Sequence, residues 1–314
     1  MPKIWSYGFI NLDIITQGVD AWPDKSGLVW VQNIDFKLGG VALNPAVTIA
    51  KLGGVPVGII GYIGQDLVGQ LIRTELTDLG VDITQLNLDE TQASGICIVC
   101  VHPDGERSFL IGAGANANLN TRPLRIKGLS AGDFFHLGGV AALTQLQDKL
   151  EQVRRQRVNI SLDLSFDSSG QMWSRVAPLL PAVNICMANA DEARQLTGTT
   201  DPTGAVQKIS TAGPDTVVIK LGRDGAYISA PSWQGHVEAF TVEAIDTTGA
   251  GDSFAGAFLF GLTRDWAVEQ IATFANAVGA LCTTQAGATE GIQTYAETIA
   301  FIEAQGRAGN WDWS

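Results

Sequence analysis

The sequence is poor in cysteine, histidine and basic residues, and it contains no long apolar run. Lys and Arg number 20 against 32 Asp and Glu, which gives a formal net charge of −12. Nucleic acids and anionic membranes attract clustered Lys and Arg, so this balance argues against both as partners. No stretch of about 18 uncharged apolar residues occurs, and the opening MPKIWSYGFI has no basic leader before a long apolar segment. We therefore expect a cytoplasmic protein.

Only four cysteines and three histidines are present. Cys97 and Cys100 form a CxxC pair, a spacing found in metal knuckles and redox sites. In an extended segment, however, residues three apart point to opposite faces, and no second cysteine pair or spaced histidine completes a ligand set. We interpret the cysteines as reduced side chains that pack as small apolar residues.

Apolar segments of strand length alternate with segments of helical period along most of the 314 residues. The strand candidates show little apolar and polar alternation, which is typical of a parallel sheet covered on both faces. They are residues 3–10, 56–64, 133–139, 158–165, 183–189 and 215–222. The helix candidates are residues 42–54, 66–80, 146–156, 190–198, 250–264, 266–284 and 294–304. This order predicts an α/β protein with a mainly parallel sheet.

Two segments, at about 14–37 and 94–112, break this alternation. Both have the pattern of strands and hairpins, and HPDGER at 102–107 is a turn signal. We expect them to form a small separate sheet inserted into a single domain that spans residues 1–314. Projecting sheets of this kind serve as lids or as dimer surfaces, so we also expect a homodimer.

The motif DTTGAGD, residues 246–252, lies between a strand-like segment, 236–245, and a helix with a buried apolar face. The N–H groups of a first helical turn have no partners within the helix, and the helix dipole adds roughly half a positive charge there. Three small residues leave these donors open to an anion such as a phosphoryl group: Gly249, Ala250 and Gly251.

Asp252 follows these residues directly, where its carboxylate would repel a bound phosphate. The two are compatible if an alcohol lies between them, because the carboxylate can deprotonate the hydroxyl while the amides stabilise the transferring group. We expect the helix dipole to keep Asp252 ionised and therefore a weak base, which a loose phosphoryl transition state tolerates. The motif predicts a phosphotransferase, although a glycine turn with Asp can also simply cap a helix.

The segment DTTGAGDSFAGAF resembles the C-terminal signature of the ribokinase-like (PfkB) carbohydrate kinases. GGVALNPAVTIAKLGG, residues 39–54, is similar to their N-terminal signature, and the likeness runs in order from near Ile4 to near Ile302. It implies a three-layer αβα domain with a β-sheet lid, and ATP and Mg²⁺ as cofactors. It also implies that Asp252 is the catalytic base beside an anion hole formed by the amides of Gly249, Ala250 and Gly251.

The acceptor site is expected near the N-terminus. Asn11 and Asp13 lie two apart in an extended segment and therefore share a face. They could form a polar strand end or bind sugar hydroxyls. The resemblance favours the second interpretation. Asn44 before Pro45 also has the pattern of an N-cap with Pro at N1. The resemblance adds three residues to the sugar site: Gly39, Gly40 and Asn44.

The nucleotide site is expected in the second half of the chain. NADE, residues 189–192, has the spacing of a capping box, while the resemblance places Asn189 and Glu192 near Mg²⁺ and the phosphates, usually through water. The resemblance also puts four residues beside the nucleotide: Lys220, Gly222, Gly225 and Asn276. Lys220 stands where the family often has a small hydroxyl residue. Four further positions match the border of a K⁺ site in some members: Asp246, Thr248, Cys282 and Gly287.

The acceptor itself is expected to be a neutral sugar, ribose- or fructose-like. A charged acceptor needs Arg or Lys in its pocket, whereas this chain has Val-Ala-Leu at 41–43. FLIGAGANA, after Arg107, also lacks the Tyr and Arg of ketodeoxygluconate kinases. A nucleoside is the alternative, because apolar residues at 41–43 and three tryptophans near the lid suit a flat base. These are Trp5, Trp22 and Trp30.

Two alternatives come from other classes. A non-catalytic sugar-binding regulator would keep the sugar ligands but lose Asp252 or the glycines, and all of them are present. A dinucleotide-binding dehydrogenase would need its glycine-rich turn directly after the first strand, where this chain has GFINLD. An active kinase is therefore preferred over both.

Overall fold

The computed structural model describes residues 1–19, 25–102, 107–122, 124, 126–139, 146–165 and 170–313. Its main sheet has the strand order β13-β12-β11-β10-β9-β8-β1-β4-β5. The strands are β1 (Ile4–Tyr7), β4 (Val57–Gly64), β5 (Asp82–Asp89), β8 (Phe134–Gly138), β9 (Asn159–Asp163), β10 (Ile185–Asn189), β11 (Thr216–Lys220), β12 (Ala226–Ala230) and β13 (Trp233–Val237). Only β12 pairs antiparallel, on both of its sides. The predicted α/β class with a mainly parallel sheet is confirmed.

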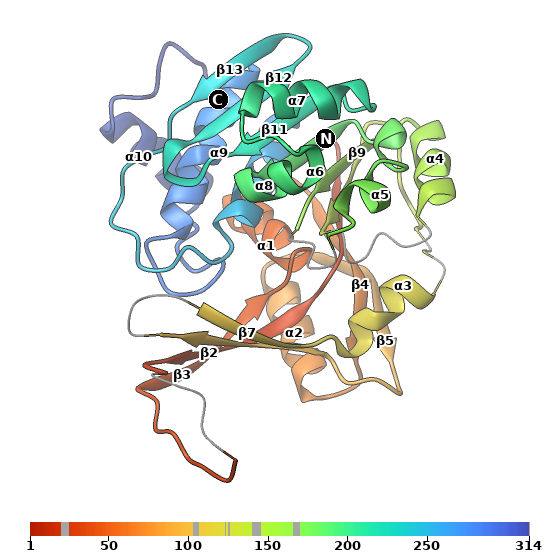
Figure 1. The fold of residues 1–314 in the computed structure, drawn as a ribbon, viewed down its shortest axis with the longest axis vertical. Coiled ribbons are helices and arrows are strands. Elements are labelled where there is room, and N and C mark those ends of the chain that lie inside the picture. The colour runs from red at the N-terminus through yellow and green to blue at the C-terminus, as the bar shows by residue number, and fades with distance from the viewer. Residues whose placement is uncertain are drawn as a thin grey trace.

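Helices cover both faces of this sheet (Figure 1). They are α1 (Leu43–Leu52), α2 (Leu67–Asp78), α3 (Asn118–Thr121), α4 (Gln147–Arg155), α5 (Met172–Val176), α6 (Ala190–Thr197), α7 (Pro202–Thr211), α8 (Ala250–Leu262), α9 (Val268–Cys282) and α10 (Tyr295–Ala304). Alternate residues of each strand enter different cores, as the pleat requires. Ile4 and Phe134 pack in the core with α1, α8 and α9. Trp5 and Phe135 pack in the core with α4, α6 and α7, so the protein has three layers.

A second, four-stranded sheet, which we call the lid, has the order β3-β2-β6-β7 and projects away from the body (Figure 1). Its strands are β2 (Asn11–Gln17), β3 (Asn33–Gly39), β6 (Gly95–Val101) and β7 (Arg107–Gly112). The two predicted insertions thus supply this sheet, although β2 begins earlier than expected, at Asn11. Residues 103–106 of the predicted HPDGER turn lie outside the described residues.

Two details of the sequence interpretation are wrong. The strand-like segment 236–245 contributes only its first two residues to β13, because pairing with β12 ends at Val237. The prediction also missed β5, a sheet-edge strand whose mostly polar residues are largely half-buried or exposed.

The cysteine prediction is confirmed, since all four thiols are free and buried. Within the described ranges, no helix is long and apolar enough to cross a membrane.

Candidate active site

The glycine motif begins a buried helix, as predicted. Gly249 is the N-cap of α8 and has φ +73°, in the left-handed region. A Cβ at Gly249 would lie 2.2 Å from the Ala288 carbonyl oxygen, so no larger residue fits without displacing backbone. A Cβ at Gly251 would meet only the end of the Lys220 side chain, at 3.3 Å. The first-turn amides of α8 therefore lie at an accessible surface.

That surface borders a pocket of about 560 Å³. The lining includes the β11–β12 turn, residues 239–244 and α9, a size and setting suited to a nucleotide. Four of the five residues predicted to bind the cofactor line it, Lys220, Gly222, Gly225 and Asn276, whereas Asn189 is not part of its lining. Asn276 also shapes the wall, because its Nδ2 donates to the carbonyls of Val237 and Glu238, both at 3.0 Å.

Asn44 is not the N-cap of α1, contrary to prediction. Ala42 is the N-cap, and its side chain makes no capping bond. The helix starts earlier because the Asn44 N–H already donates to the Gly40 carbonyl at 2.9 Å. This frees the Asn44 amide, whose Nδ2 donates to Oδ2 of Asp252 at 2.7 Å.

The expectation that the helix dipole would hold down the basicity of Asp252 does not match its surroundings in the fold. Burial raises the pKa of Asp252 above its usual range, although the Asn44 hydrogen bond and the positive charge of Lys220 act in the opposite direction. The helix dipole does not decide the outcome, because desolvation of the carboxylate is the larger effect. A raised pKa makes Asp252 a stronger base toward a hydroxyl once it is ionised.

The lid contributes the two polar residues at the start of β2. Asn11 and Asp13 are both buried, 7% and 8% exposed. A Cβ on Gly39 would lie 2.1 Å from Oδ2 of Asp13, so this glycine is required for the carboxylate to lie against the neighbouring strand. Burial, with the nearby charges of Asp252 and Asp246, raises the pKa of Asp13 to about 7. The lid acid and the α8 acid therefore belong to one electrostatic site.

Asn116 is a site residue that the sequence interpretation missed. Its Nδ2 donates to Oδ1 of Asn11 at 2.9 Å and to the Ile10 carbonyl at 3.0 Å, while its Oδ1 accepts from the Ile10 N–H. It is fully buried and fixes the Asn11 amide. The available signal was a single polar residue inside GAGANA, a segment otherwise made of Gly and Ala.

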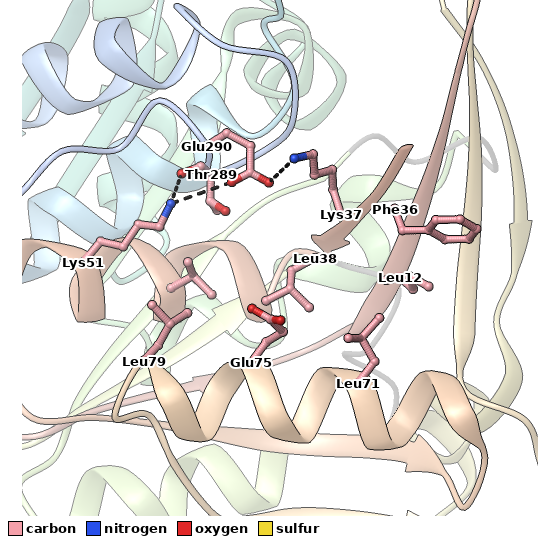
Figure 2. Close-up of a pocket in the computed structure, with 11 residues that line it drawn as sticks. Leu12, Phe36, Lys37, Leu38, Lys51, Leu71, Glu75, Leu79, Thr289 and Glu290 are labelled. Atoms are coloured by element: carbon pink, nitrogen blue, oxygen red, sulfur yellow. Dashed lines mark hydrogen bonds and ion pairs between the residues drawn. The ribbon is translucent and has the colours of Figure 1, made fainter. Parts of the chain in front are cut away.

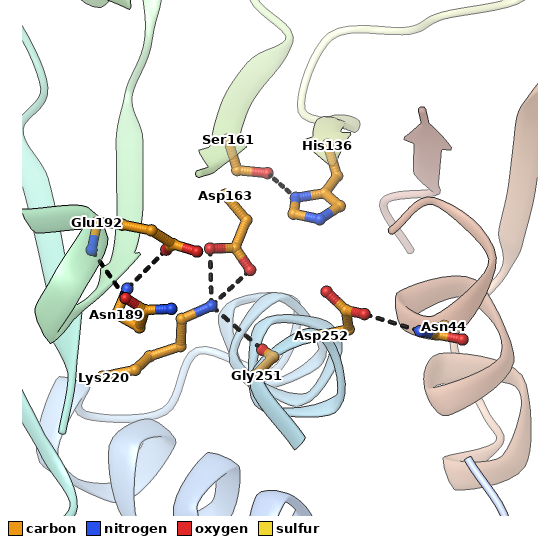
Figure 3. A network of polar contacts seen from close by, with 9 residues as sticks. All are labelled: Asn44, His136, Ser161, Asp163, Asn189, Glu192, Lys220, Gly251 and Asp252. Carbon is orange, nitrogen blue, oxygen red and sulfur yellow. Dashed lines mark hydrogen bonds and ion pairs between the residues drawn. The ribbon is translucent and has the colours of Figure 1, made fainter. Parts of the chain in front are cut away.

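Asp163, at the C-terminal end of β9, was also missed. Lys220 Nζ donates to both carboxylate oxygens of Asp163 at 2.7 Å and lies 3.4 Å from the Gly251 carbonyl (Figure 3). Burial acts to lower the pKa of Lys220, but the carboxylates of Asp163 and Glu192 outweigh it and raise this pKa. An acid at the carboxyl end of a central parallel strand was the signal for Asp163, because ligands of α/β proteins bind there.

The capping box at the start of α6 is confirmed. Asn189 Oδ1 accepts from the Glu192 N–H and Glu192 Oε2 accepts from the Asn189 N–H, both at 2.8 Å. Glu192 is 6% exposed and lies on the Lys220 side of the site (Figure 3). Its predicted role near Mg²⁺ stays a prediction.

The four residues expected at a K⁺ site lie together beside the start of α8. Asp246 accepts from the Thr248 N–H at 2.8 Å and from the Gly287 N–H at 2.9 Å. Cys282 Sγ lies 3.1 Å from the Ala288 carbonyl and 3.6 Å from that of Thr248. The described residues include no group of three or more His, Cys, Asp or Glu placed to hold a metal ion.

A smaller cleft of about 250 Å³ lies where the lid meets the body. Figure 2 shows Lys37 of β3 and Lys51 of α1 both directed at Glu290, with ion-pair distances of 3.3 and 3.8 Å. Leu71 of α2 and Leu79, the residue that caps the C-terminal end of α2, lie on the opposite side of the cleft (Figure 2). Glu290 thus ties the lid to the body next to Gly287, a connection that no local sequence pattern indicated.

Comparison with known proteins gives the family. Residues 1–295 match the pfkB family carbohydrate kinase model, and the chain belongs to this family. It is 32% identical over 306 residues to aminoimidazole riboside kinase of Salmonella typhimurium, covering 92% of this chain and 91% of that protein. It is 29% identical to ribokinase of Haemophilus influenzae, covering 94% and 97%.

A solved structure supports the same assignment. Fructokinase from Vibrio cholerae, bound to fructose, ADP and calcium, superposes with a TM-score of 0.81 at 26% identity, covering 96% of this chain and 99% of that one. A double mutant of that fructokinase was solved with potassium. The predicted ribokinase-like fold and kinase class are confirmed.

Proposed function

We propose that this protein transfers the γ-phosphoryl group of ATP to a hydroxyl of a neutral sugar, ribose- or fructose-like. The observation that carries the proposal is the position of Asp252. Its carboxylate is held by Asn44, and it belongs to the same first helical turn whose open amides border the nucleotide-sized pocket. A base for an incoming hydroxyl thus adjoins donors for a transferring phosphoryl group.

The reaction follows from this geometry. The sugar hydroxyl gives its proton to Asp252 while its oxygen bonds to the γ-phosphorus, and the bond to the ADP oxygen breaks. The amides at Gly249, Ala250 and Gly251 stabilise the charge on the transferring group. Lys220, on the pocket wall beside Gly251, supplies positive charge near the phosphates.

The sugar is proposed to be held by five residues: Asn11, Asp13, Gly39, Gly40 and Asn44. A carboxylate and amides suit hydroxyl groups, and Gly39 is required by the position of Asp13. Lys37, the strand neighbour of Asp13, is paired with Glu290 and is not available to a charged acceptor. A neutral sugar therefore fits best.

A nucleoside is the second candidate, favoured by the riboside kinase among the relatives. The tryptophans do not support it. Trp5 is buried against Gly58 in the core opposite α8, and Trp30 is 86% exposed. Trp22 lies outside the described residues. The sugar remains the preferred acceptor.

ATP is proposed to bind with Mg²⁺ near Asn189 and Glu192, and K⁺ to be bordered by Asp246, Thr248, Cys282 and Gly287. Mg²⁺ and K⁺ are hard cations that bind carboxylate and carbonyl oxygens as ligands. The residues present offer such oxygens and therefore fit these ions. Mg²⁺ would neutralise charge on the phosphates, and K⁺ would add positive charge beside the anion hole. The ions named in the Vibrio fructokinase structures support a cation requirement.

A homodimer through the lid is proposed because the lid exposes large apolar side chains. Ile34, Phe36, Phe109, Leu110 and Ile111 are each 47–62% exposed. Such a surface is typical of an interface. Light scattering at micromolar concentration should give twice the chain mass, and a monomer would contradict the dimer.

A cytoplasmic location stays a prediction, which the free thiols fit.

An ADP-release screen with Mg·ATP tests the function. We expect turnover with a neutral pentose or hexose, and weaker turnover or none with sugar acids, sugar phosphates and nucleosides. Turnover confined to nucleosides would favour the second candidate. Sugar binding by calorimetry without any ADP release would instead indicate a non-catalytic regulator.

A further inference from the structure

His136 in β8 is a buried polar residue to which neither the family signatures nor the proposed mechanism gives a role. It is 0% exposed, and its Nδ1 lies 2.9 Å from Oγ of Ser161 in β9. Its Nε2 has no hydrogen-bond partner among the residues that the structure describes. The neighbours of His136 along β8 are Phe135 and Leu137, so an apolar residue would be the ordinary choice at this position.

The strand register determines which way His136 points. Phe135 and Leu137 pack in the core with α4, α6 and α7, whereas Phe134 packs in the core with α1 and α8. His136 therefore lies on the side of the sheet covered by α1 and α8. These are the two helices whose first turns contain Asn44 and Asp252.

The two carboxylate oxygens of Asp252 face different neighbours. Oδ2 accepts from Asn44, and Figure 3 shows the other oxygen on the side of His136, with the Nε2 edge of the imidazole directed at it. A buried nitrogen without a partner lowers stability, and proteins retain such violations chiefly at functional sites. Among the residues drawn in Figure 3, the reacting group on the side of this nitrogen is Asp252.

We propose that His136 is a positioning residue for Asp252: its Nε2–H makes no hydrogen bond in the structure and would donate to Oδ1 in the working enzyme, while Asn44 holds Oδ2. This inference rests on the proposed role of Asp252 as the base. An ionised carboxylate only accepts hydrogen bonds, so Nε2 must carry the proton. Nδ1 is then an acceptor, and the Ser161 hydroxyl donates to it and fixes the tautomer.

The surroundings keep the imidazole neutral. Burial, with the positive charge of Lys220, lowers the pKa of His136 to about 3. A neutral donor from the sheet and a neutral donor from α1 then fix the carboxylate plane from two sides. The remaining lone pairs are left to face the sugar hydroxyl, and the alignment for proton transfer is set before the sugar binds.

The test compares His136→Leu with His136→Gln in the full chain. Leu removes both nitrogens, and we expect kcat to fall roughly 10- to 100-fold, the effect of misplacing a catalytic group. KM for ATP should stay within about twofold, and the melting temperature should fall only modestly, because one unpartnered nitrogen is removed while the buried Ser161 hydroxyl loses its hydrogen bond. Gln restores an N–H donor and should recover most of the lost kcat.

Ser161→Ala provides a second measure that does not alter the imidazole. It removes the donor to Nδ1 and should lower kcat about 3- to 10-fold, since the tautomer is no longer fixed. Ser6→Ala is the control, because Ser6 lies beside His136 in β1 but makes no hydrogen bond with it. It should leave kcat within about twofold.

The outcomes separate this inference from the proposed function. An Asp252→Asn variant with near-native turnover would overturn the base assignment and the inference together. An inactive Asp252→Asn variant alongside a His136→Leu variant of near-native kcat would overturn the inference alone. A loss of kcat in His136→Leu that follows a large fall in melting temperature and is not rescued by Gln would show a purely structural residue, and would also overturn the inference.

Discussion

Asn44 Nδ2 donates to Asp252 Oδ2 at 2.7 Å, although the two residues lie 208 positions apart. The contact joins the first turns of α1 and α8, which carry the two signature segments of the family. It places the proposed sugar-binding part of the chain directly against the acid proposed to deprotonate the sugar. The two signatures thus form one site.

This contact predicts a pH effect. The Asn44 hydrogen bond lowers the pKa of Asp252 against the effect of burial, so Asn44→Leu should raise that pKa further. The base must be ionised to act, so kcat/KM should begin to fall at a higher pH on acidification than it does in the wild-type protein. Thr48→Val, one turn along α1, should leave the pH of this fall unchanged. An unchanged pH of the fall in Asn44→Leu would contradict the role of the contact.

The Asp163–Lys220 pair predicts a stability effect that can be separated from activity. Both side chains are buried, 5% and 12% exposed. Lys220→Met leaves a carboxylate without its cation and should lower the free energy of unfolding by about 3–5 kcal/mol. The double variant with Asp163→Asn should recover most of that stability but not turnover, because the phosphates still lack the Lys220 charge. Urea unfolding and ADP release measure the two effects, and turnover restored in the double variant would contradict the phosphate role.

Gly249 predicts a packing effect. Gly249→Ala places a Cβ 2.2 Å from the Ala288 carbonyl as well as straining a φ of +73°. The start of α8 should shift, and kcat should fall roughly 100-fold. Gly198→Ala is the matched control, with φ +77° and no atom within 4 Å of the added Cβ. It should lower stability by about 1 kcal/mol from strain alone and leave kcat unchanged. Equal kcat losses in both variants would contradict the account.

Asp13 predicts two opposite pH trends. Its folded pKa of about 7 exceeds its unfolded value, so the native state holds a proton that the unfolded chain has released. Stability should fall as pH rises from about 4 to about 7, and Asp13→Asn should flatten that trend. Sugar binding should strengthen over the upper part of the range, because the ionised carboxylate accepts hydroxyl protons. Calorimetry at several pH values checks this, and a pH-independent affinity for the sugar would contradict it.

The central strands and the helix after DTTGAGD could be predicted because their signals are local. Apolar runs mark buried parallel strands, and glycines before a helical period mark the start of α8. The edge strand β5 carries mostly polar residues at partly exposed positions, so it has no comparable signal. The lid could be located because two strand-like segments interrupt the α/β alternation.

The polar contacts of the site could not be predicted, because they join residues that are distant in sequence. Asn44 was interpreted as a cap from its neighbour Pro45, whereas its partner is on α8. Lys220 departs from the family pattern, and its partner Asp163 is 57 positions away. The raised pKa of Asp252 depends on burial by the assembled fold, which no local motif reveals.

The central claim is that Asp252 is the base in a sugar phosphotransferase. The most direct measurement is ADP release by Asp252→Asn with the sugar that the wild-type protein accepts, together with calorimetry of sugar binding to both proteins. The account predicts that turnover is abolished while the affinity for the sugar changes by less than about threefold, because Asn keeps the size of the side chain and one oxygen that can still accept from Asn44. Near-native turnover in Asp252→Asn would contradict it.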